Sequence, residues 1–213
     1  MLAAFFVSSN LVSRLHPRAA PSGLDAKSDR RDFRQVYANG GAAALGAGLG
    51  LLTDSALGIW LVTATLSAAA ADTWATSIGI RSRVLPRLPW SGRTVPAGSN
   101  GGMTLLGTGA GAAGALVVAG TGAFAANMPL LLPIGTLIGF FGMVADSMLG
   151  ALLQGRFRCP ACNAASEWRI HRCGAATTRE GGMAWLNNDG VNLAATALAG
   201  CAAAAVWHWL PSG

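Results

Sequence analysis

Residues 103–126 read MTLLGTGAGAAGALVVAGTGAFAA, and residues 130–153 read LLLPIGTLIGFFGMVADSMLGALL. Each run is 24 residues long, and Asp146 is the only charged residue in the pair. A helix rises about 1.5 Å per residue, so each run is longer than the ~30 Å hydrocarbon core of a membrane. Only three residues separate the two runs, which predicts a tight helical hairpin that crosses a membrane twice.

Three further runs are long enough to cross a membrane, namely residues 36–52, 56–76 and 190–210. A sixth apolar run, residues 1–13, spans only about 20 Å as a helix. Its positive charges follow the apolar segment, whereas a secretory signal peptide carries them in front. We therefore expect a short first helix, or a chain start that falls inside that helix.

Composition agrees with these runs. Hydrophobic residues make up 52% of the 213 residues and charged residues only 11%, whereas a soluble domain carries roughly 25% charged residues. This excludes an ordinary cytosolic enzyme, a coiled coil and a disordered tail. The sequence predicts an all-α fold, a polytopic membrane bundle of about six transmembrane helices, as a single integral membrane domain over residues 1–213.

All 15 Lys and Arg residues fall within three connecting segments, residues 14–34, 77–102 and 154–189. The two other connections, residues 53–55 and 127–129, carry no basic residue. With six crossings the three basic segments share one face of the membrane, which the positive-inside rule makes cytoplasmic. We expect both termini on the opposite side. The Ala-, Gly- and Arg-rich composition favours the inner membrane of a bacterium.

The formal net charge is +6. The basic residues lie beside predicted spans, where they set orientation and meet anionic lipid headgroups. We therefore expect a lipid bilayer as a partner and no nucleic acid. No feature of the sequence predicts an oligomeric state.

Short motifs recur at the predicted helix ends. Asn39-Gly40-Gly41, Asn100-Gly101-Gly102 and Asn188-Asp189-Gly190 open three helices on the cytoplasmic side. Ala71-Asp72-Thr73 and Ala145-Asp146-Ser147 close two others. The pattern predicts three parallel helix–loop–helix repeats about an axis along the membrane normal. A chance match between short motifs is the rival explanation.

Three acidic residues are candidates for a magnesium site. Asp72 and Asp146 lie within predicted spans, where a carboxylate usually faces a polar interior, a partner or a metal. Asp189 and Asn192 are three residues apart, hence on one face of the last helix, with Asn188 near its N-cap. Carboxylate oxygens are ligands for Mg²⁺. For Asp72 and Asp146, contact with interfacial water or pairing with loop arginines is the alternative.

The stretch Pro96-Ala97-Gly98-Ser99-Asn100-Gly101-Gly102 leads into a predicted helix. Glycines let backbone N–H groups approach a phosphate, and a helix N-terminus adds a positive dipole end. The stretch lacks the Gly-Lys-Ser/Thr of a Walker A loop, so a flexible helix start is the alternative.

Cys159 and Cys162 form a CxxC, and His171 and Cys173 follow as HxC. Three thiolates and one imidazole suit a tetrahedral structural zinc ion. A disulfide is disfavoured in a reducing cytoplasm. The HxC spacing is tighter than usual for zinc, so free thiols remain the alternative.

Four segments together resemble one family. They are residues 29–41 (DRRDFRQVYANGG), 71–76 (ADTWAT), 95–102 (VPAGSNGG) and 185–189 (WLNND). In order and content they resemble the family of human transmembrane protein 19, which includes plant and cyanobacterial phytyl-phosphate kinases. The resemblance covers residues 2–210 and implies an integral membrane protein.

For characterised members, the resemblance implies transfer of a nucleotide γ-phosphate, often from CTP, to a prenyl monophosphate. The family motif typically reads Asp-Thr-Trp-Ala-Ser-Glu, and here Ser77 stands at the Glu position. Residues i and i+5 lie about 140° apart on a helix, so that Glu need not share a cluster with Asp72.

The predicted function is therefore that of a prenyl-phosphate kinase. Its expected Mg²⁺ ligands and catalytic groups are Asp72, Asp146 and Asp189. The residues predicted to bind nucleotide phosphates are Gly98, Asn100, Gly101, Gly102, Asn188 and Asn192. The residues predicted to bind the prenyl phosphate or to neutralise the transferred charge are Arg31, Arg34 and Arg93. Cytidylyl transfer to a lipid phosphate and transport of a small anion are the rival functions. A transporter places its site near the bilayer midplane, whereas these residues gather toward one face.

Overall fold

A computed structural model describes residues 1–15, 33–53 and 56–210, which form six α-helices and one small sheet. The helices are α1 (Leu2–Leu15), α2 (Phe33–Thr53), α3 (Leu57–Gly79), α4 (Leu105–Ala126), α5 (Leu131–Leu152) and α6 (Asn188–Trp209). The strands are β1 (Arg156–Arg158), β2 (Ala165–Ser166) and β3 (Thr178–Gly181), in the order β2-β1-β3.

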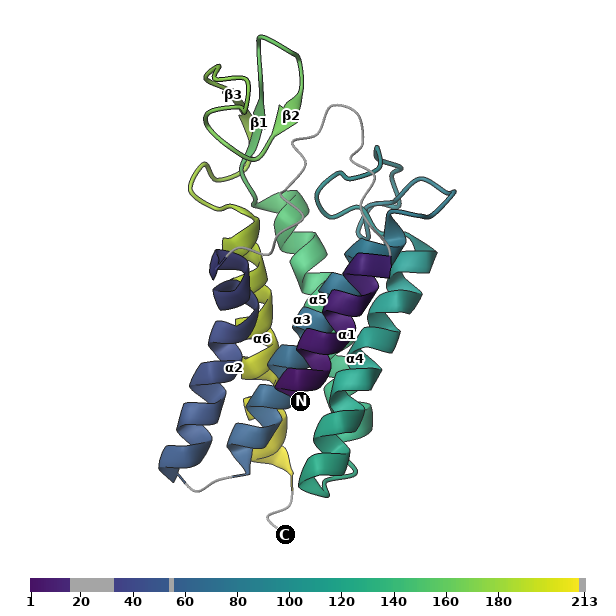
Figure 1. Cartoon of the computed structure of the whole chain (residues 1–213), viewed down its shortest axis with the longest axis vertical. Helices are drawn as coiled ribbons and strands as arrows, with labels where there is room; N and C mark the ends of the chain where they lie inside the picture. The colour runs from purple at the N-terminus through teal and green to yellow at the C-terminus, as the bar shows by residue number, and fades with distance from the viewer. Residues whose placement is uncertain (16–32, 54–55, 211–213) are drawn as a thin grey trace.

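Helix α3 lies at the centre of the bundle and packs against all five other helices. Its residues 63–71 are all buried. The other helices follow one another around it in the order α2, α6, α5, α4 and α1 (Figure 1). The predicted mostly helical fold, with six helices among the described residues, is thus confirmed.

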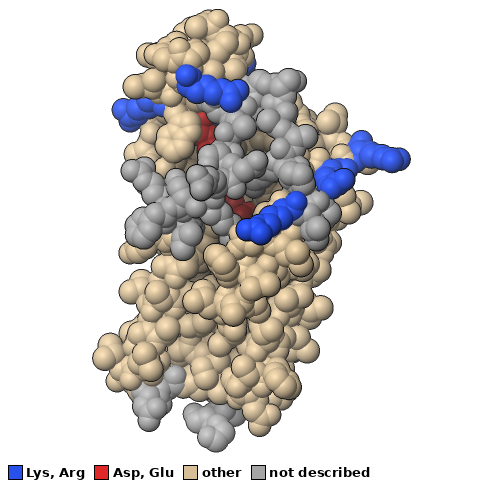
Figure 2. All heavy atoms as spheres, viewed as in Figure 1, with Lys and Arg blue, Asp and Glu red and all other residues tan. Residues whose placement is uncertain are grey.

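Successive helices run up and down, so α3 and α5 end where α4 and α6 begin (Figure 1). We call this the loop end of the bundle; it carries residues 80–104 and the sheet. On the face shown in Figure 2, the basic side chains gather at the loop end, and Asp or Glu atoms are visible among them. The described basic segments thus share one end of the bundle.

Three of the described helices, α4, α5 and α6, are long and apolar enough to cross a membrane. Helices α2 and α3 have 21 and 23 residues. The 14 residues of α1 agree with the predicted short first helix. Crossing by all six helices remains a prediction.

Helices α2 and α3 cross closely because glycines face each other. A Cβ on Gly58 would lie 2.5 Å from the Cα of Gly50 and 3.0 Å from the carbonyl oxygen of Gly46. Small residues allow such contacts where lipid gives no hydrophobic drive between helices. The crossing has no room for even one added methyl group.

Gly58→Ala is expected to lower the free energy of unfolding by about 1–3 kcal/mol, because the methyl group meets backbone atoms that cannot rotate away. Thermal unfolding in detergent measures the effect. Gly48→Ala is the matched control, since nothing lies within 4 Å of its added Cβ. Equal melting temperatures for the two variants would contradict this close crossing.

The structure corrects one expectation about the helix starts. Helix α2 begins at Phe33, so Asn39-Gly40-Gly41 lies inside it and does not open it. Residues 33–38 contain no glycine or proline to delay the helix. Asn100-Gly101-Gly102 precedes α4, and Asn188-Asp189-Gly190 forms the first turn of α6. The three motifs therefore occupy different positions, and the repeat remains a prediction.

The sheet was not predicted. Strand β1 pairs antiparallel with β2 and with β3, and both β1 and β2 are at most three residues long. Such short strands give no alternating pattern. Arg158 forms an ion pair with Glu180 across the sheet, and its second nitrogen lies 3.4 Å from that carboxylate. The Glu180 carboxylate raises the pKa of the Arg158 guanidinium.

Candidate functional site

Three helices meet at one small contact below the loop end. A Cβ on Gly142 of α5 would lie 2.7 Å from the Cβ of Ala68 on α3 and 3.5 Å from the Cβ of Ala199 on α6. Glycine and alanine at this contact let the three backbones approach closely. We call it the three-helix contact.

Both candidate acids lie one turn above the three-helix contact, toward the loop end. Asp72 follows Ala68 by four residues, and Asp146 follows Gly142 by four residues. Side chains four residues apart share a helix face. Asp72 and Asp146 therefore lie on the converging faces of α3 and α5, and both are half-buried.

Helix α6 and helix α2 complete this region. Asn192 lies seven residues before Ala199, hence on nearly the same face of α6, and it is buried. The hydroxyl of Thr196 donates to the carbonyl oxygen of Ala38 on α2 at 3.3 Å. Helix α6 thus contacts α2 in this part of the bundle.

The glycine-rich turn packs against α5 just beyond Asp146. A Cβ on Gly101 would overlap the carbonyl oxygen of Ser147 and lie 3.2 Å from the backbone nitrogen of Ala151. Gly101 has φ +73°, a left-handed conformation that glycine adopts readily. The close approach and this conformation both require glycine here.

Two consecutive turns shape the same stretch. The N–H of Ser99 donates to Pro96 at 3.1 Å, and the N–H of Gly102 donates to Ser99 at 3.1 Å. Gly98 is exposed with φ +83°, and Asn100 is half-buried. The Gly102 N–H is thus engaged within the turn. A phosphate would have to be bound by other N–H groups of this stretch.

The N-cap of α6 is the residue next to Asn188, in agreement with the predicted position of Asn188 near the cap. Asn187 is the N-cap, and its side chain accepts a hydrogen bond from the N–H of Gly190 at 3.0 Å. Asn188 is therefore the first helical residue. Asp189 lies in the first turn, where a carboxylate complements the helix dipole.

Of the three candidate arginines, the structure describes the side chain of Arg93 alone. Arg93 is exposed on a hairpin, where its carbonyl oxygen accepts from the N–H of Leu88 at 3.0 Å. Arg31 lies outside the described residues, and so does the side chain of Arg34.

Ser77, at the position of the family glutamate, faces another helix. It is buried, and its hydroxyl lies 3.4 Å from the hydroxyl of Ser13 on α1. Asp72 instead shares its face with Ala68, which lies against Gly142 of α5. The two positions therefore face different neighbours, as the angle of about 140° between them predicts.

Gln154, just after α5, was not among the residues predicted from the sequence. It is 2% exposed, and its Nε2 has no hydrogen-bond partner among the described residues. A Cβ on Gly150 would lie 3.5 Å from its Oε1 and 3.9 Å from the N of Gly101. A Cβ on Gly182, beside β3, would overlap its carbonyl oxygen. The sequence signal for Gln154 is a polar amide placed directly after the apolar residues Leu152 and Leu153.

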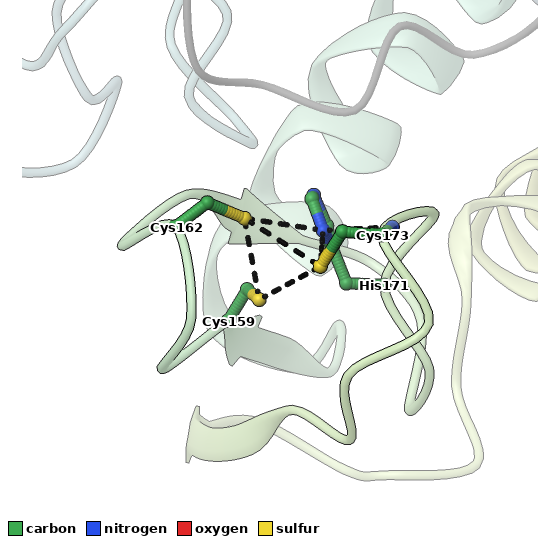
Figure 3. Close-up of side chains that lie close together, drawn as sticks. All are labelled: Cys159, Cys162, His171 and Cys173. Carbon is green, nitrogen blue, oxygen red and sulfur yellow. Dashed lines mark hydrogen bonds between the residues drawn. The ribbon is translucent and has the colours of Figure 1, made fainter.

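The predicted Cys/His group comes together in the structure (Figure 3). The ligand atoms of Cys159, Cys162, His171 and Cys173 all lie within 4.8 Å of one another. The three Sγ–Sγ distances are 3.3, 3.6 and 3.8 Å. His171 Nδ1 lies 3.3 Å from Cys162 Sγ and 3.0 Å from Cys173 Sγ. None of these three cysteines forms a disulfide.

Two hairpin tips supply these four side chains. Cys159 follows β1 and Cys162 precedes β2, and the Cys159 N–H donates to Ala164 at 2.8 Å. In the second tip, the His171 N–H donates to Ala175 at 2.9 Å, and Gly174 turns the chain with φ +86°.

The thiols influence one another strongly. The neighbouring Cys159 sulfur, which shares a hydrogen bond with the Cys162 thiol, raises the pKa of Cys162 to about 11. Burial opposes ionisation of Cys159, but hydrogen bonds from the Cys162 backbone and thiol and from the Ala161 backbone outweigh it and lower the Cys159 pKa. Ionisation of Cys159 is therefore favoured, and ionisation of Cys162 is disfavoured.

A cavity of about 450 Å³ lies between this loop and the start of α6. Trp168, Ile170, Trp185 and Asn187 are among its lining residues. Both tryptophans and Ile170 are exposed. This cavity was not predicted from the sequence, since its walls come from segments on either side of β3.

Comparison with known proteins identifies the family. The model of the family described as integral membrane protein DUF92 matches residues 1–200. The chain belongs to the DUF92 family. The apolar helices α4, α5 and α6 agree with an integral membrane protein.

Two curated relatives are similar to the chain. It is 29% identical over 160 residues to "Uncharacterized membrane protein MJ0933" of Methanocaldococcus jannaschii, covering 72% of this chain and 64% of that protein. It is 31% identical over 133 residues to "Protein PGR" of Arabidopsis thaliana, covering 57% of this chain and 45% of that protein. The match thus covers less than two thirds of either relative. No solved structure matches the chain.

Proposed function

We propose that this DUF92 protein is a prenyl-phosphate kinase, which transfers the γ-phosphate of a nucleotide such as CTP to a polyprenyl monophosphate. The observation that carries the proposal is the position of Asp72 and Asp146, on converging faces of α3 and α5 beside the Gly101 turn. Carboxylates at this depth of a bundle are usually functional.

The resemblance to the family of transmembrane protein 19 and phytyl-phosphate kinases supports the proposal. Of the four resembling segments, residues 71–76 lie on α3, residues 95–102 pack on α5, and residues 185–189 start α6. Segments about 110 residues apart in the chain thus meet at the same end of the bundle. A shared site accounts for this better than three separate structural roles.

The donor set fits a hard cation. Carboxylates with nearby amides supply the oxygen ligands that Mg²⁺ takes, and Mg²⁺ keeps several water and phosphate ligands besides. Asp72 and Asp146 are the residues that would hold it, with Asp189 at the start of α6. The cation would neutralise the phosphate charge that develops during transfer.

The chain's own groups would bind and orient the substrates. An oxygen of the prenyl phosphate attacks the γ-phosphorus, the bond from that phosphorus to the bridging oxygen breaks, and CDP leaves. Asn192 and the N-terminus of α6 would orient phosphate oxygens. Because the acceptor is already an anion, the reaction needs no strong general base.

The position of Ser77 is compatible with this chemistry. Its side chain lies against Ser13 of α1 and shares no helix face with Asp72. A glutamate at position 77 would therefore not lie on the helix face that carries Asp72. The serine therefore removes no ligand from the proposed pair of carboxylates.

The proposed orientation puts the loop end in the cytoplasm of a bacterium, at the inner membrane. The basic residues of the described loops all lie toward that end, which the positive-inside rule assigns to the cytoplasm. Nucleotide is available on that side. The prenyl tail would reach the site sideways from the bilayer, between helices rich in Ala and Gly.

The test uses the full chain in nanodiscs with Mg²⁺, labelled CTP and a panel of prenyl monophosphates. The proposal predicts prenyl diphosphate and CDP in equal amounts. Release of pyrophosphate with a CDP-linked lipid would instead identify a cytidylyltransferase. Absence of product from CTP, ATP and GTP alike would overturn the kinase proposal. Uptake of a labelled small anion into proteoliposomes would then identify a transporter.

A further inference from the structure

The cluster of Cys159, Cys162, His171 and Cys173 has the dimensions of a metal centre. For zinc–sulfur bonds of about 2.3 Å, tetrahedral geometry puts two sulfur ligands about 3.8 Å apart. The observed Sγ–Sγ distances of 3.3–3.8 Å are within about 0.5 Å of this value. Three sulfurs and one imidazole nitrogen therefore surround a space of the size that one tetrahedral ion occupies.

The architecture of the two tips supports a metal more than a group of thiols. Each tip supplies two ligands, and each has a left-handed residue beside them, Asn163 in one and Gly174 in the other. Backbone groups of Ala161 and Cys162 hydrogen-bond to the Cys159 sulfur. Hydrogen bonds to sulfur orient a thiolate ligand and stabilise its charge.

The loop between α5 and α6 has little else to hold it together. Its strands have two to four residues, and Phe157 and Cys159 are its only buried apolar side chains among residues 156–183. A segment with so small a core is stable only with a staple. A bound metal ion supplies that stability because the unfolded loop has no preformed site.

We propose that Cys159, Cys162, His171 and Cys173 bind one structural zinc ion, which joins the two hairpin tips and fixes the loop over the start of α6. This site does not depend on the proposed kinase activity. Sulfur-rich tetrahedral sites select zinc over the hard cations that carboxylates bind. All four protein ligands are present, so the site is closed, as structural zinc sites are.

The zinc ion would also hold one wall of the cavity beside α6 in place. Glu167 to Ile170 line that cavity, and they lead directly into the ligand His171. The opposite wall includes Trp185 and the N-cap Asn187. Joining the two tips therefore holds Trp168 and Ile170 opposite Trp185.

Metal analysis of the full chain, purified in detergent without added metal or chelator, tests the proposal. We expect about one zinc per chain, and Cys173→Ser is expected to lose most of it. Cys201→Ser is the matched control, because Cys201 is an exposed cysteine on α6 far from the cluster in sequence. Full zinc in Cys173→Ser, or none in the wild-type protein, would overturn the proposal.

Two further measurements cover a variant that fails to fold. His171→Cys keeps four ligands and is expected to retain zinc, whereas His171→Ala loses it. Wild-type protein reconstituted with Co²⁺ is expected to show the intense visible bands of tetrahedral thiolate coordination. Octahedral bands, or a retained zinc content in His171→Ala, would contradict the proposed ligand set. None of these readouts requires enzyme activity, so the outcome is independent of the kinase test.

Discussion

Asp72→Asn and Asp146→Asn are each expected to lower the rate of phosphoryl transfer at least about 100-fold, a loss typical of removing one group that stabilises charge in a transition state. Both substitutions keep the size of the side chain. Each removes the negative charge that would hold a cation against the nucleotide phosphates.

Folding is expected to survive both changes. The two carboxylates are half-buried, and asparagine keeps the size of the side chain and can still form hydrogen bonds. The thermal unfolding temperature in detergent should therefore stay near the wild-type value. A combined loss of activity and of folding would indicate a structural role instead.

Glu180→Gln is the matched control for these variants. Glu180 is exposed on β3, where it pairs with Arg158 at the surface. Surface ion pairs contribute little to stability, about 0–1 kcal/mol. Wild-type activity is expected for Glu180→Gln. Activity within about threefold of wild type in Asp72→Asn would remove Asp72 from the proposed site.

Gly101→Ala is expected to have the largest effect on stability, a loss of about 3 kcal/mol or more in the free energy of unfolding. Two causes add. Alanine is strained at φ +73°, and its Cβ would overlap the carbonyl oxygen of Ser147 on α5. The turn must therefore move away from α5, and activity should fall with it.

Gly92→Ala separates these two causes. Gly92 has φ +64°, but nothing lies within 4 Å of an added Cβ. It should lose only about 1–2 kcal/mol, the strain of a left-handed conformation. Chemical or thermal unfolding of both variants measures the difference. Equal losses would show that the Gly101 turn does not pack against α5.

The sequence predicted the long helices well because their signal is long. Runs 103–126 and 130–153 became α4 (Leu105–Ala126) and α5 (Leu131–Leu152), with bounds shifted by at most two residues. The start of α2 was missed because Arg34 and Gln35 are polar and lie outside the apolar run, although both residues are helical. The strands were missed because two to four residues carry no usable period.

The candidate site was predicted in part. Residue type and depth singled out Asp72 and Asp146, and spacing singled out the Cys/His cluster that the structure brings within 4.8 Å. The three-helix contact could not be predicted, because Ala68, Gly142 and Ala199 are ordinary residues in a chain rich in Ala and Gly. Tertiary packing alone decides which of these small residues meet.

The fate of the γ-phosphate tests the central proposal most directly. Purified wild-type protein in nanodiscs is incubated with Mg²⁺, γ-labelled CTP and a prenyl monophosphate, and the lipid is then extracted. A prenyl-phosphate kinase transfers the label to the extracted lipid as a prenyl diphosphate, with one CDP released per label transferred. Label found only in CTP, inorganic phosphate or pyrophosphate, with the lipid unlabelled across all chain lengths, would contradict the account.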